Sequence, residues 1–254
     1  MIEFQGAGFE VAAGRVLLAD VNLALEAGTT TALLGRSGSG KTTLLRMVNR
    51  LLQPTSGVVM VTGVATTAAN VIDLRRGIGY VIQETGLFPH FTVARNVGLV
   101  PELQGQSRAA IATRVREMLA LVGLGGAGLE QRYPHQLSGG QRQRVGLARA
   151  LAADPPILLM DEPFGALDPL TRAEMQEMLR DLLTRMQKTV LIVTHDLDEA
   201  LFLASRIVLV EAGRIAADLP AGEFLKSTVP AVQEYARAFR RRDGPEQGGE
   251  ATRS

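Results

Sequence analysis

The sequence predicts an α/β protein with a mostly parallel sheet flanked by helices. Three short apolar runs, at residues 30–35, 156–163 and 189–196, have the length and composition of buried strands. Segments between them repeat apolar residues at helical spacing, and a glycine-rich stretch joins the first strand to a helix. Continuous apolar strands that alternate with helices are typical of a parallel sheet covered on both faces.

The first half of the chain gives these elements in order. Residues 42–52 form a predicted helix with its apolar residues on one side, and a turn at 54–57 leads into a further strand. Ser107 is the expected N-cap of a helix that extends to residue 122. We expect mostly helix and loop between residues 88 and 149.

The second half alternates in the same way. Six apolar residues recur at helical spacing, and we interpret them as core: Met175, Met178, Leu179, Leu182, Leu183 and Met186. Residues 206–217 predict a hairpin that turns at Ala212 and Gly213. A short helix is expected from Pro230, and the composition of the last residues predicts a disordered tail.

Composition narrows the classes of function. The 254 residues include 27 basic and 26 acidic side chains, so the formal charge is +1 and nucleic acid is not an expected partner. The chain has no cysteine, which fits a reducing cytosol. No apolar run approaches the roughly 18 residues that crossing a bilayer requires, and we expect no secretion signal. These features predict a cytosolic protein.

The glycine-rich stretch after the first strand predicts a phosphate-binding loop. Its residues match G-x-x-x-x-G-K-[ST] between an apolar strand and a helix, the context that this pattern requires. Backbone N–H groups close around phosphates, the lysine adds a positive charge and the threonine hydroxyl serves Mg²⁺. A glycine turn with a chance lysine is the weaker alternative. The candidate nucleotide-binding residues are Gly35, Arg36, Ser37, Gly38, Ser39, Gly40, Lys41, Thr42 and Thr43.

Polar side chains end the next two apolar strands. Asp161 and Glu162 follow one strand, at the sheet edge where open α/β sheets bind ligands. Asp161 is expected to hold the Mg²⁺ shell, and Glu162 to face an attacking water as a base or orienter. His195 ends the following strand and can hydrogen-bond a terminal phosphate. The alternative is that the two acids merely close a strand, and His195 taken alone would be a core or capping histidine.

A second glycine-containing segment, LSGGQ at residues 137–141, supplies a family resemblance. Together with the phosphate loop and the acidic strand end, this signature segment resembles the nucleotide-binding subunit of ATP-binding cassette (ABC) transporters over residues 2–225. Gln83 stands where that family has its glutamine loop, and Leu167 and Asp168 where it has its D-loop. The resemblance implies a P-loop NTPase with an antiparallel N-terminal β subdomain, an inserted helical subdomain, and ATP and Mg²⁺ as cofactors.

The resemblance also implies roles for individual residues. Hydrolysis is assigned to Glu162, His195, Lys41 and Gln83, and metal binding to Thr42, Gln83 and Asp161. Ser138, Gly139, Gly140 and Gln141 would close over the γ-phosphate of a second copy in a head-to-tail homodimer, and Asp168 would link the two sites. A helix expected to start near Gln141 would place exposed N–H groups there.

The same resemblance divides the chain. Residues 1–230 would form the ABC ATPase domain, with 1–86 and 150–230 as the catalytic core and 87–149 as the helical signature subdomain. A short helix and tail would follow at 231–254. The helical subdomain would touch transmembrane permease subunits on the cytoplasmic side of the cell membrane. Four apolar residues near its start either form a groove for a permease helix or pack inside it: Leu87, Phe88, Phe91 and Val93.

One position departs from the family. Its members commonly stack adenine on an aromatic residue near position 11 or 12, where this chain has Val11 and Ala12. Phe9, on the same face of the strand, is the candidate substitute. Without a substitute, base binding loses a stacking contribution of about 1–3 kcal/mol.

The segments around Gln83 and Asp168 most resemble importers of glycine betaine, choline and related osmoprotectants. Such an importer also works with an extracytoplasmic solute-binding protein. Another small-solute importer or an efflux system is the alternative, since the solute is selected by other subunits. A soluble ABC ATPase of DNA repair or translation would need a coiled-coil insertion, a second cassette or a basic surface. A small kinase would have no use for Ser138 or the D-loop.

Overall fold

The computed structural model describes residues 1–12, 14–83, 85–126, 128–165 and 167–243. Most of the predicted disordered tail, residues 244–254, therefore lies outside the described residues. The strands are β1 (Ile2–Val11), β2 (Arg15–Leu25), β3 (Thr30–Leu34), β4 (Ser56–Val61), β5 (Val64–Ala65), β6 (Ile78–Val81), β7 (Ile157–Asp161), β8 (Thr189–Thr194), β9 (Arg206–Glu211) and β10 (Arg214–Pro220). The helices are α1 (Lys41–Val48), α2 (Val71–Arg76), α3 (Val93–Leu103), α4 (Arg108–Leu121), the 3-10 turn η1 (Pro134–Gln136), α5 (Gly139–Leu151), α6 (Pro169–Arg185), α7 (Leu197–Leu203), α8 (Ala221–Phe224) and α9 (Pro230–Asp243).

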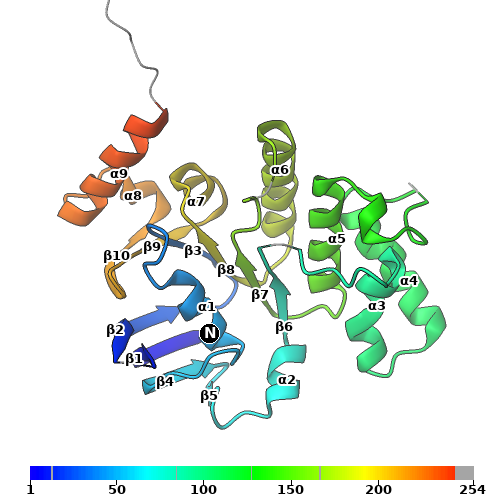
Figure 1. Cartoon of the computed structure of the whole chain (residues 1–254), viewed down its shortest axis with the longest axis horizontal. Helices are drawn as coiled ribbons and strands as arrows, with labels where there is room; N and C mark the ends of the chain where they lie inside the picture. Colours follow the sequence, from blue (N-terminus) through cyan, green and yellow to red (C-terminus); the bar gives the residue numbers. More distant parts are fainter. Residues whose placement is uncertain (13, 84, 127, 166, 244–254) are drawn as a thin grey trace, which may run out of the picture.

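The central sheet has the order β10-β9-β3-β8-β7-β6, as Figure 1 shows. Strands β9, β3, β8, β7 and β6 run parallel, and β10 pairs antiparallel with β9. Every residue of β7 and β8 is buried, as expected for strands covered on both faces. The predicted mostly parallel sheet is confirmed, and the carboxyl ends of its strands meet at one edge.

A second, antiparallel sheet has the order β2-β1-β4-β5. The core between this sheet and the central one contains Phe4, Leu33, Leu44 and Leu45, so α1 is packed between the two sheets. Helix α1 ends at Val48, earlier than the predicted residue 52, because Arg50 adopts the left-handed region with φ 53° and closes the helix by a bond from its N–H to Met47 O.

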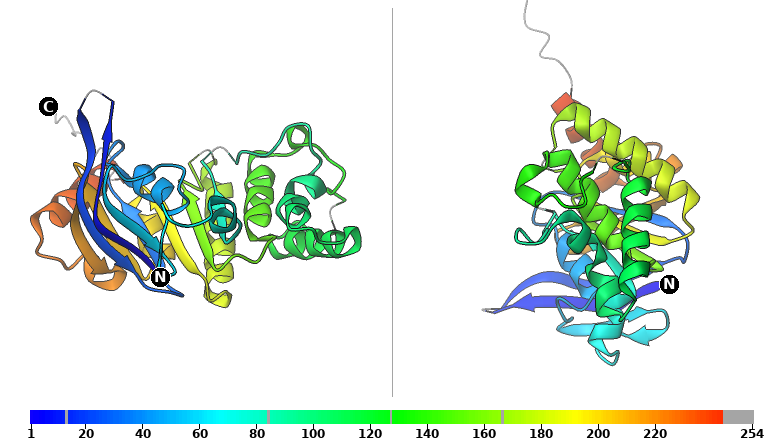
Figure 2. Two further views of the ribbon diagram at one scale, coloured as in Figure 1. Left: turned by 90° about the horizontal axis from the view of Figure 1, so that it is seen from below. Right: turned by 90° about the vertical axis from the view of Figure 1, so that its right-hand side faces the viewer.

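Helices α3, α4 and α5 form a helical portion beside the β6 edge of the central sheet, seen in both views (Figures 1 and 2). Apolar residues from all three helices join one core cluster with Met175, Leu179 and Leu182 of α6. The other three predicted residues, Met178, Leu183 and Met186, are partly buried and pack against this cluster, so half of the series is core and half lies at its margin. Ser107 caps α4 by accepting a hydrogen bond from Ala110 N.

Helices α8 and α9 lie at the opposite end of the molecule (Figures 1 and 2). They follow the β9–β10 hairpin, which turns at Ala212 and Gly213 as predicted, with φ of 46° and 76°. A third apolar cluster joins α7, α8 and α9 to the outer part of the central sheet through Leu34, Leu197 and Phe224. Among the described residues, none of the helices combines the length and apolarity needed to cross a bilayer.

Candidate nucleotide-binding site

The phosphate loop connects β3 to α1 and depends on its glycines. Gly35, Gly38 and Gly40 have φ of 156°, 79° and 107°, a backbone conformation that side chains disfavour. A Cβ on Gly35 would also lie 2.3 Å from the Val210 carbonyl oxygen of neighbouring β9. The glycines therefore let the loop pass close to the sheet before α1 begins at Lys41.

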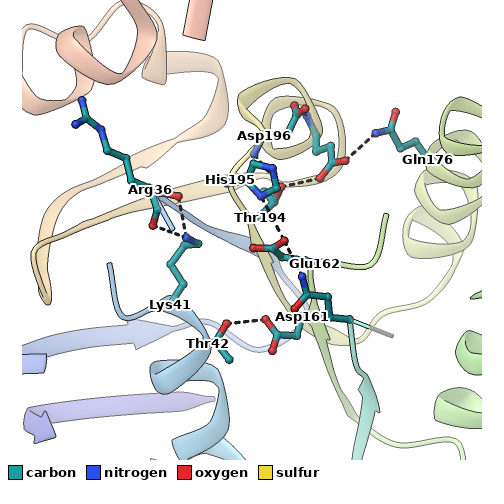
Figure 3. A network of polar contacts seen from close by, with 12 residues as sticks. Arg36, Lys41, Thr42, Asp161, Glu162, Gln176, Thr194, His195 and Asp196 are labelled. Atoms are coloured by element: carbon teal, nitrogen blue, oxygen red, sulfur yellow. Dashed lines mark hydrogen bonds and ion pairs between the residues drawn. The ribbon is translucent and has the colours of Figure 1, made fainter. Parts of the chain in front are cut away.

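Lys41 is only 4% exposed and folds back over its own loop (Figure 3). Its Nζ donates hydrogen bonds to the carbonyl oxygens of Gly35 at 2.8 Å and Arg36 at 2.9 Å. Burial lowers the pKa of Lys41, while the nearby charges of Glu162 and Asp161 oppose that shift. The ammonium group is thus held at the loop, where the oxygens of a phosphate can replace the two carbonyls as acceptors.

Thr42 and Asp161 face each other across the start of α1 (Figure 3). Thr42 Oγ1 donates to Asp161 Oδ1 at 2.8 Å, and Arg46 Nη2 lies 3.9 Å from Asp161 Oδ2. Asp161 is 3% exposed, and burial raises its pKa despite the hydrogen bond and the arginine. A hydroxyl and a buried carboxylate with few cationic partners are oxygen donors that suit Mg²⁺.

Glu162, His195 and Gln83 converge beside this pair. Gln83 Nε2 donates to Glu162 Oε2 at 3.3 Å, and His195 Nδ1 lies 3.4 Å from the same oxygen. Glu162 has φ of 46°, unusual for a glutamate, and its N–H bonds Val193 O of the adjacent strand at 3.0 Å. A strained backbone of this kind is common at functional sites. It aims the carboxylate at the phosphate loop.

These residues line one pocket of about 980 Å³. Its wall includes residues 36–43, Gln83, Glu162 and His195, so sequence-predicted groups from four separate segments meet. Five further lining residues were not predicted from the sequence: Arg15, Leu17, Tyr235, Ala238 and Phe239. Asp161 lines an adjoining pocket that shares Gln83 with this one.

Phe9, the candidate substitute for the adenine-stacking aromatic, packs instead against the core between the two sheets. It is not among the described residues that line the pocket. The pocket is lined instead by Arg15 and Leu17 of β2, the strand that follows Val11 and Ala12.

The signature segment lies at the start of α5, in the helical portion. Ser138 Oγ accepts from Gln141 N at 3.2 Å, and Gln141 Oε1 accepts from Ser138 N at 3.0 Å, a reciprocal capping arrangement. The helix begins at Gly139, two residues before the predicted start near Gln141, because this capping places Gly139 and Gly140 in the first turn. Among the described residues, the segment contributes nothing to the pocket wall of its own chain.

Asp168 caps the next helix, α6, and lies next to the signature segment. Its Oδ1 accepts from Thr171 N at 3.1 Å, and this hydrogen bonding lowers the pKa of Asp168. A Cβ on Gly140 would meet the Thr171 methyl group at 2.5 Å. The first turns of α5 and α6 therefore pack closely, with their amide ends side by side.

The apolar residues 87–93 divide between the two predicted environments. Val93 is buried and Leu87 packs against the core of the helical portion, whereas Phe88 is 41% exposed. The rings of Phe88 and Phe91 pack in a tilted arrangement, with 5.1 Å between their centroids. Asn96, which the sequence did not single out, is fully buried and bonds the backbone of Phe88 in both directions.

Comparisons with known proteins agree with this geometry. The profile of the family described as ABC transporter matches residues 18–165. The chain is similar to the glycine betaine uptake system ATP-binding protein YehX of Escherichia coli (strain K12), with 45% identity covering 89% of this chain and 79% of that protein. It is similar to the choline transport ATP-binding protein OpuBA of Bacillus subtilis (strain 168), with 48% identity covering 80% of this chain and 53% of that protein.

The fold is also similar to a solved structure, the dimeric post-hydrolysis state of the ATP-binding cassette MJ0796 bound to ADP and Pi. The TM-score is 0.79 and the identity 33%, over 87% of this chain and 99% of that one. The matched profile includes the phosphate loop, Gln83 and both strand-end carboxylates. The chain belongs to the ABC transporter family, as an ATP-binding cassette.

Proposed function

We propose that the chain is the ATP-hydrolysing subunit of an ABC importer. The observation that carries this proposal is the convergence of the phosphate loop, Gln83 and the strained Glu162 on one pocket, with Asp161 hydrogen-bonded to Thr42 of its wall. Each group suits one part of ATP hydrolysis: phosphate binding, metal binding and activation of water.

Nucleotide binding is assigned to residues 35–43. Their backbone amides and the Lys41 ammonium group bind the β- and γ-phosphates, helped by the positive end of α1. Thr42, Asp161 and Gln83 would hold Mg²⁺, which would supply positive charge to offset the negative charge of the phosphates. The fit of Thr42 and Asp161 to this role rests on their paired oxygens and on the burial of the carboxylate.

Glu162 and His195 act on the water and the γ-phosphate. The Glu162 carboxylate accepts a hydrogen bond from Gln83 and is held by its backbone conformation toward the phosphate loop. From there it orients a water molecule and takes its proton. His195, whose ring contacts the same carboxylate, donates a hydrogen bond to the γ-phosphate.

The signature segment serves a second copy of the chain. Ser138 is exposed at the amino end of α5, with Gly139 and Gly140 in the first turn, so N–H groups and the helix dipole face outward. We infer that Ser138, Gly139, Gly140 and Gln141 close over the phosphate loop of the partner copy, and that Asp168 joins the interface. The similar cassette MJ0796 is described as dimeric, which supports this arrangement.

The helical portion is the proposed contact with permease subunits, at the cytoplasmic face of the cell membrane. This gives residues 87–149 one task, while 1–86 and 150–230 form the catalytic core. The transported solute is proposed to be a quaternary amine such as glycine betaine or choline, taken up through an extracytoplasmic solute-binding protein. This choice follows the names of the two relatives.

Hydrolysis is tested by phosphate release from Mg-ATP. Glu162→Gln should lower the rate by about 10²-fold or more, as loss of a general base does. Glu177→Gln, on an exposed face of α6, is the matched carboxylate control and should leave the rate unchanged. Equal rates for the two variants, or transfer of phosphate to an acceptor other than water, would overturn the ATPase assignment.

The solute is tested in the source cells. When the tagged chain is purified from solubilised membranes, permease subunits should co-purify with it. Cells that carry only the Glu162→Gln variant should lose uptake of radiolabelled glycine betaine or choline. Retained uptake of both amines, with loss of another solute or of export, would move the chain to a different ABC transporter.

A further inference from the structure

Helix α9 contacts the nucleotide pocket from outside the segment matched by the family profile. Tyr235, Ala238 and Phe239 line the pocket, and two polar contacts tie the helix to it. Tyr235 Oη donates to the backbone carbonyl oxygen of His195 at 2.7 Å, and Arg36 Nη2 of the phosphate loop lies 3.2 Å from Glu234 Oε1. Consecutive residues of α9 therefore reach the two sides of the site.

His195 occupies a short connection between β8 and α7. Both neighbours are fixed: Thr194 Oγ1 donates to Glu199 Oε2 at 2.6 Å, and Asp196 caps α7 through Glu199 N. The His195 carbonyl group points out of this connection toward α9, and its ring, with a side chain 45% exposed, points toward Glu162. A shift of the backbone at this residue therefore changes the distance between the ring and the Glu162 carboxylate.

We propose that Tyr235 is a positioning residue for His195. Its hydroxyl group fixes the backbone of His195, and thereby holds the imidazole within reach of Glu162 and of the γ-phosphate. The ring of Tyr235 packs on the cluster that joins α9 to α7 and the central sheet, so the hydroxyl is aimed by the helix core. Helix α9 is then a structural part of the hydrolytic site. The catalytic consequence rests on the function proposed above.

The chemistry of the contact separates this role from simple anchoring of α9. Tyr235→Phe removes the hydroxyl group and keeps the ring that packs on the cluster. Ser227→Ala is the matched control, because Ser227 Oγ accepts from Val229 N in the turn just before α9, away from the His195 carbonyl group. Each variant loses one hydroxyl hydrogen bond, one on α9 and one in the turn that leads into it, and only the first involves the site.

The direct test observes His195 in the full-length protein by NMR. The chain has 3 histidines, so the ring signals of His90, His135 and His195 can be assigned by single replacement with glutamine. Tyr235→Phe should move the His195 signals and leave the other two in place, whereas Ser227→Ala should move none. This measurement needs no hydrolysis, so it decides the positioning role even if the wild-type chain proves not to hydrolyse ATP.

The kinetic test measures the effects of the variants on kcat and on KM separately. Tyr235→Phe should lower kcat about three- to tenfold with an unchanged KM for ATP, since a hydrogen bond of ordinary strength is lost from a residue that acts after binding. Ser227→Ala should keep kcat within about twofold. Unchanged His195 signals in Tyr235→Phe overturn the positioning role. Moved signals with an unchanged kcat overturn its part in hydrolysis.

Discussion

Asp161 and Glu162 are adjacent, but their surroundings give them different properties. Asp161 ends β7 and is buried against Thr42 and Arg46, whereas Glu162 turns into the left-handed region and enters the pocket. Burial raises the pKa of Asp161, so its ionised form is destabilised in the metal-free protein. The first carboxylate is thus prepared for a cation, and the second for a water molecule.

This difference predicts how stability depends on pH. The raised pKa of Asp161 means that the folded protein holds this proton more tightly than the unfolded chain, whose aspartate titrates near pH 4. Stability contributed by the group therefore falls as pH rises above about 4. Asp161→Asn keeps an acceptor for Thr42 and removes the buried charge. We expect the metal-free variant to melt at or above the wild-type temperature at neutral pH.

Calorimetry or dye-based melting from about pH 4 to pH 8 measures this effect, and a gain of about 1 kcal/mol would appear as about 2–4 °C. The gain should shrink toward the acid end, and Mg-ATP should stabilise the wild type more than the variant. Asp181→Asn, an exposed carboxylate on α6, should show no such pattern. A variant that melts lower than the wild type at neutral pH would mean that the Arg46 contact outweighs burial.

At the residue scale, the sequence predicted those site residues that stand directly after an apolar strand or within the glycine-rich loop. Lys41, Thr42, Asp161 and His195 could be named in this way. Tyr235 could not, because its approach to His195 depends on how the last helix packs on α7 and not on any local pattern. The strained backbone of Glu162 is likewise set by the neighbouring strand, through Val193 O.

At the scale of elements, the β9–β10 turn supports the phosphate loop. Gly213 N donates to Ser39 O at 3.1 Å, and Ala19 N of β2 donates to Gly213 O at 3.0 Å. A Cβ on Gly213 would lie 2.4 Å from Leu17 O, and its φ is 76°. The turn therefore joins both sheets to the loop at a position where only glycine fits.

Gly213→Ala should destabilise the protein by about 1–3 kcal/mol from the backbone conformation alone, and the clash should displace the phosphate loop and raise KM for ATP. Urea denaturation and steady-state kinetics measure the two effects. Ala212→Gly is the matched change in the same turn, and it should be close to neutral because φ at this position is 46°. Similar losses for the two variants would show that the turn is simply intolerant of change.

Asn96 fixes the loop before α3. Its side chain is fully buried, accepts from Phe88 N, and donates to the carbonyl oxygens of Phe88, Phe91 and Thr92. Asn96→Ala leaves these groups without their partner, so we expect a loss of about 2–4 kcal/mol by urea denaturation. Asn70→Ala, which removes the N-cap of α2, should cost about 1 kcal/mol. A similar cost for both would mean that water replaces the Asn96 side chain.

Element types followed from hydrophobic periodicity, and element ends often did not. The ends of α1 and the start of α5 are set by Arg50 and by the Ser138–Gln141 capping pair, which act through single backbone or side-chain contacts. The apolar run at 87–93 was ambiguous for a similar reason. The residues of this run are all apolar, and whether each is buried depends on how it packs against the core of the helical portion.

At the scale of the whole molecule, the two glycine-containing segments lie in different parts. The phosphate loop belongs to the central sheet, and the signature segment caps α5 in the helical portion, as Figure 1 shows. Arg149, at the end of α5, connects the two parts by donating to the carbonyl oxygens of Gly86 and Thr85, which follow the glutamine loop. We therefore infer that a second copy of the chain completes each site.

The most direct test of that claim is the oligomeric state of Glu162→Gln with Mg-ATP, by light scattering. This variant should bind ATP without hydrolysing it and form a stable dimer. Adding Ser138→Asp retains a good N-cap for α5 but places a negative charge at the partner's γ-phosphate, so the double variant should be monomeric. Adding Ser138→Asn, the uncharged match, should restore a measurable dimer. Two results would contradict the idea that the partner's signature segment completes the site. One is a dimer that is equally stable with Asp and with Asn at position 138, and the other is the absence of a dimer in every variant that binds ATP.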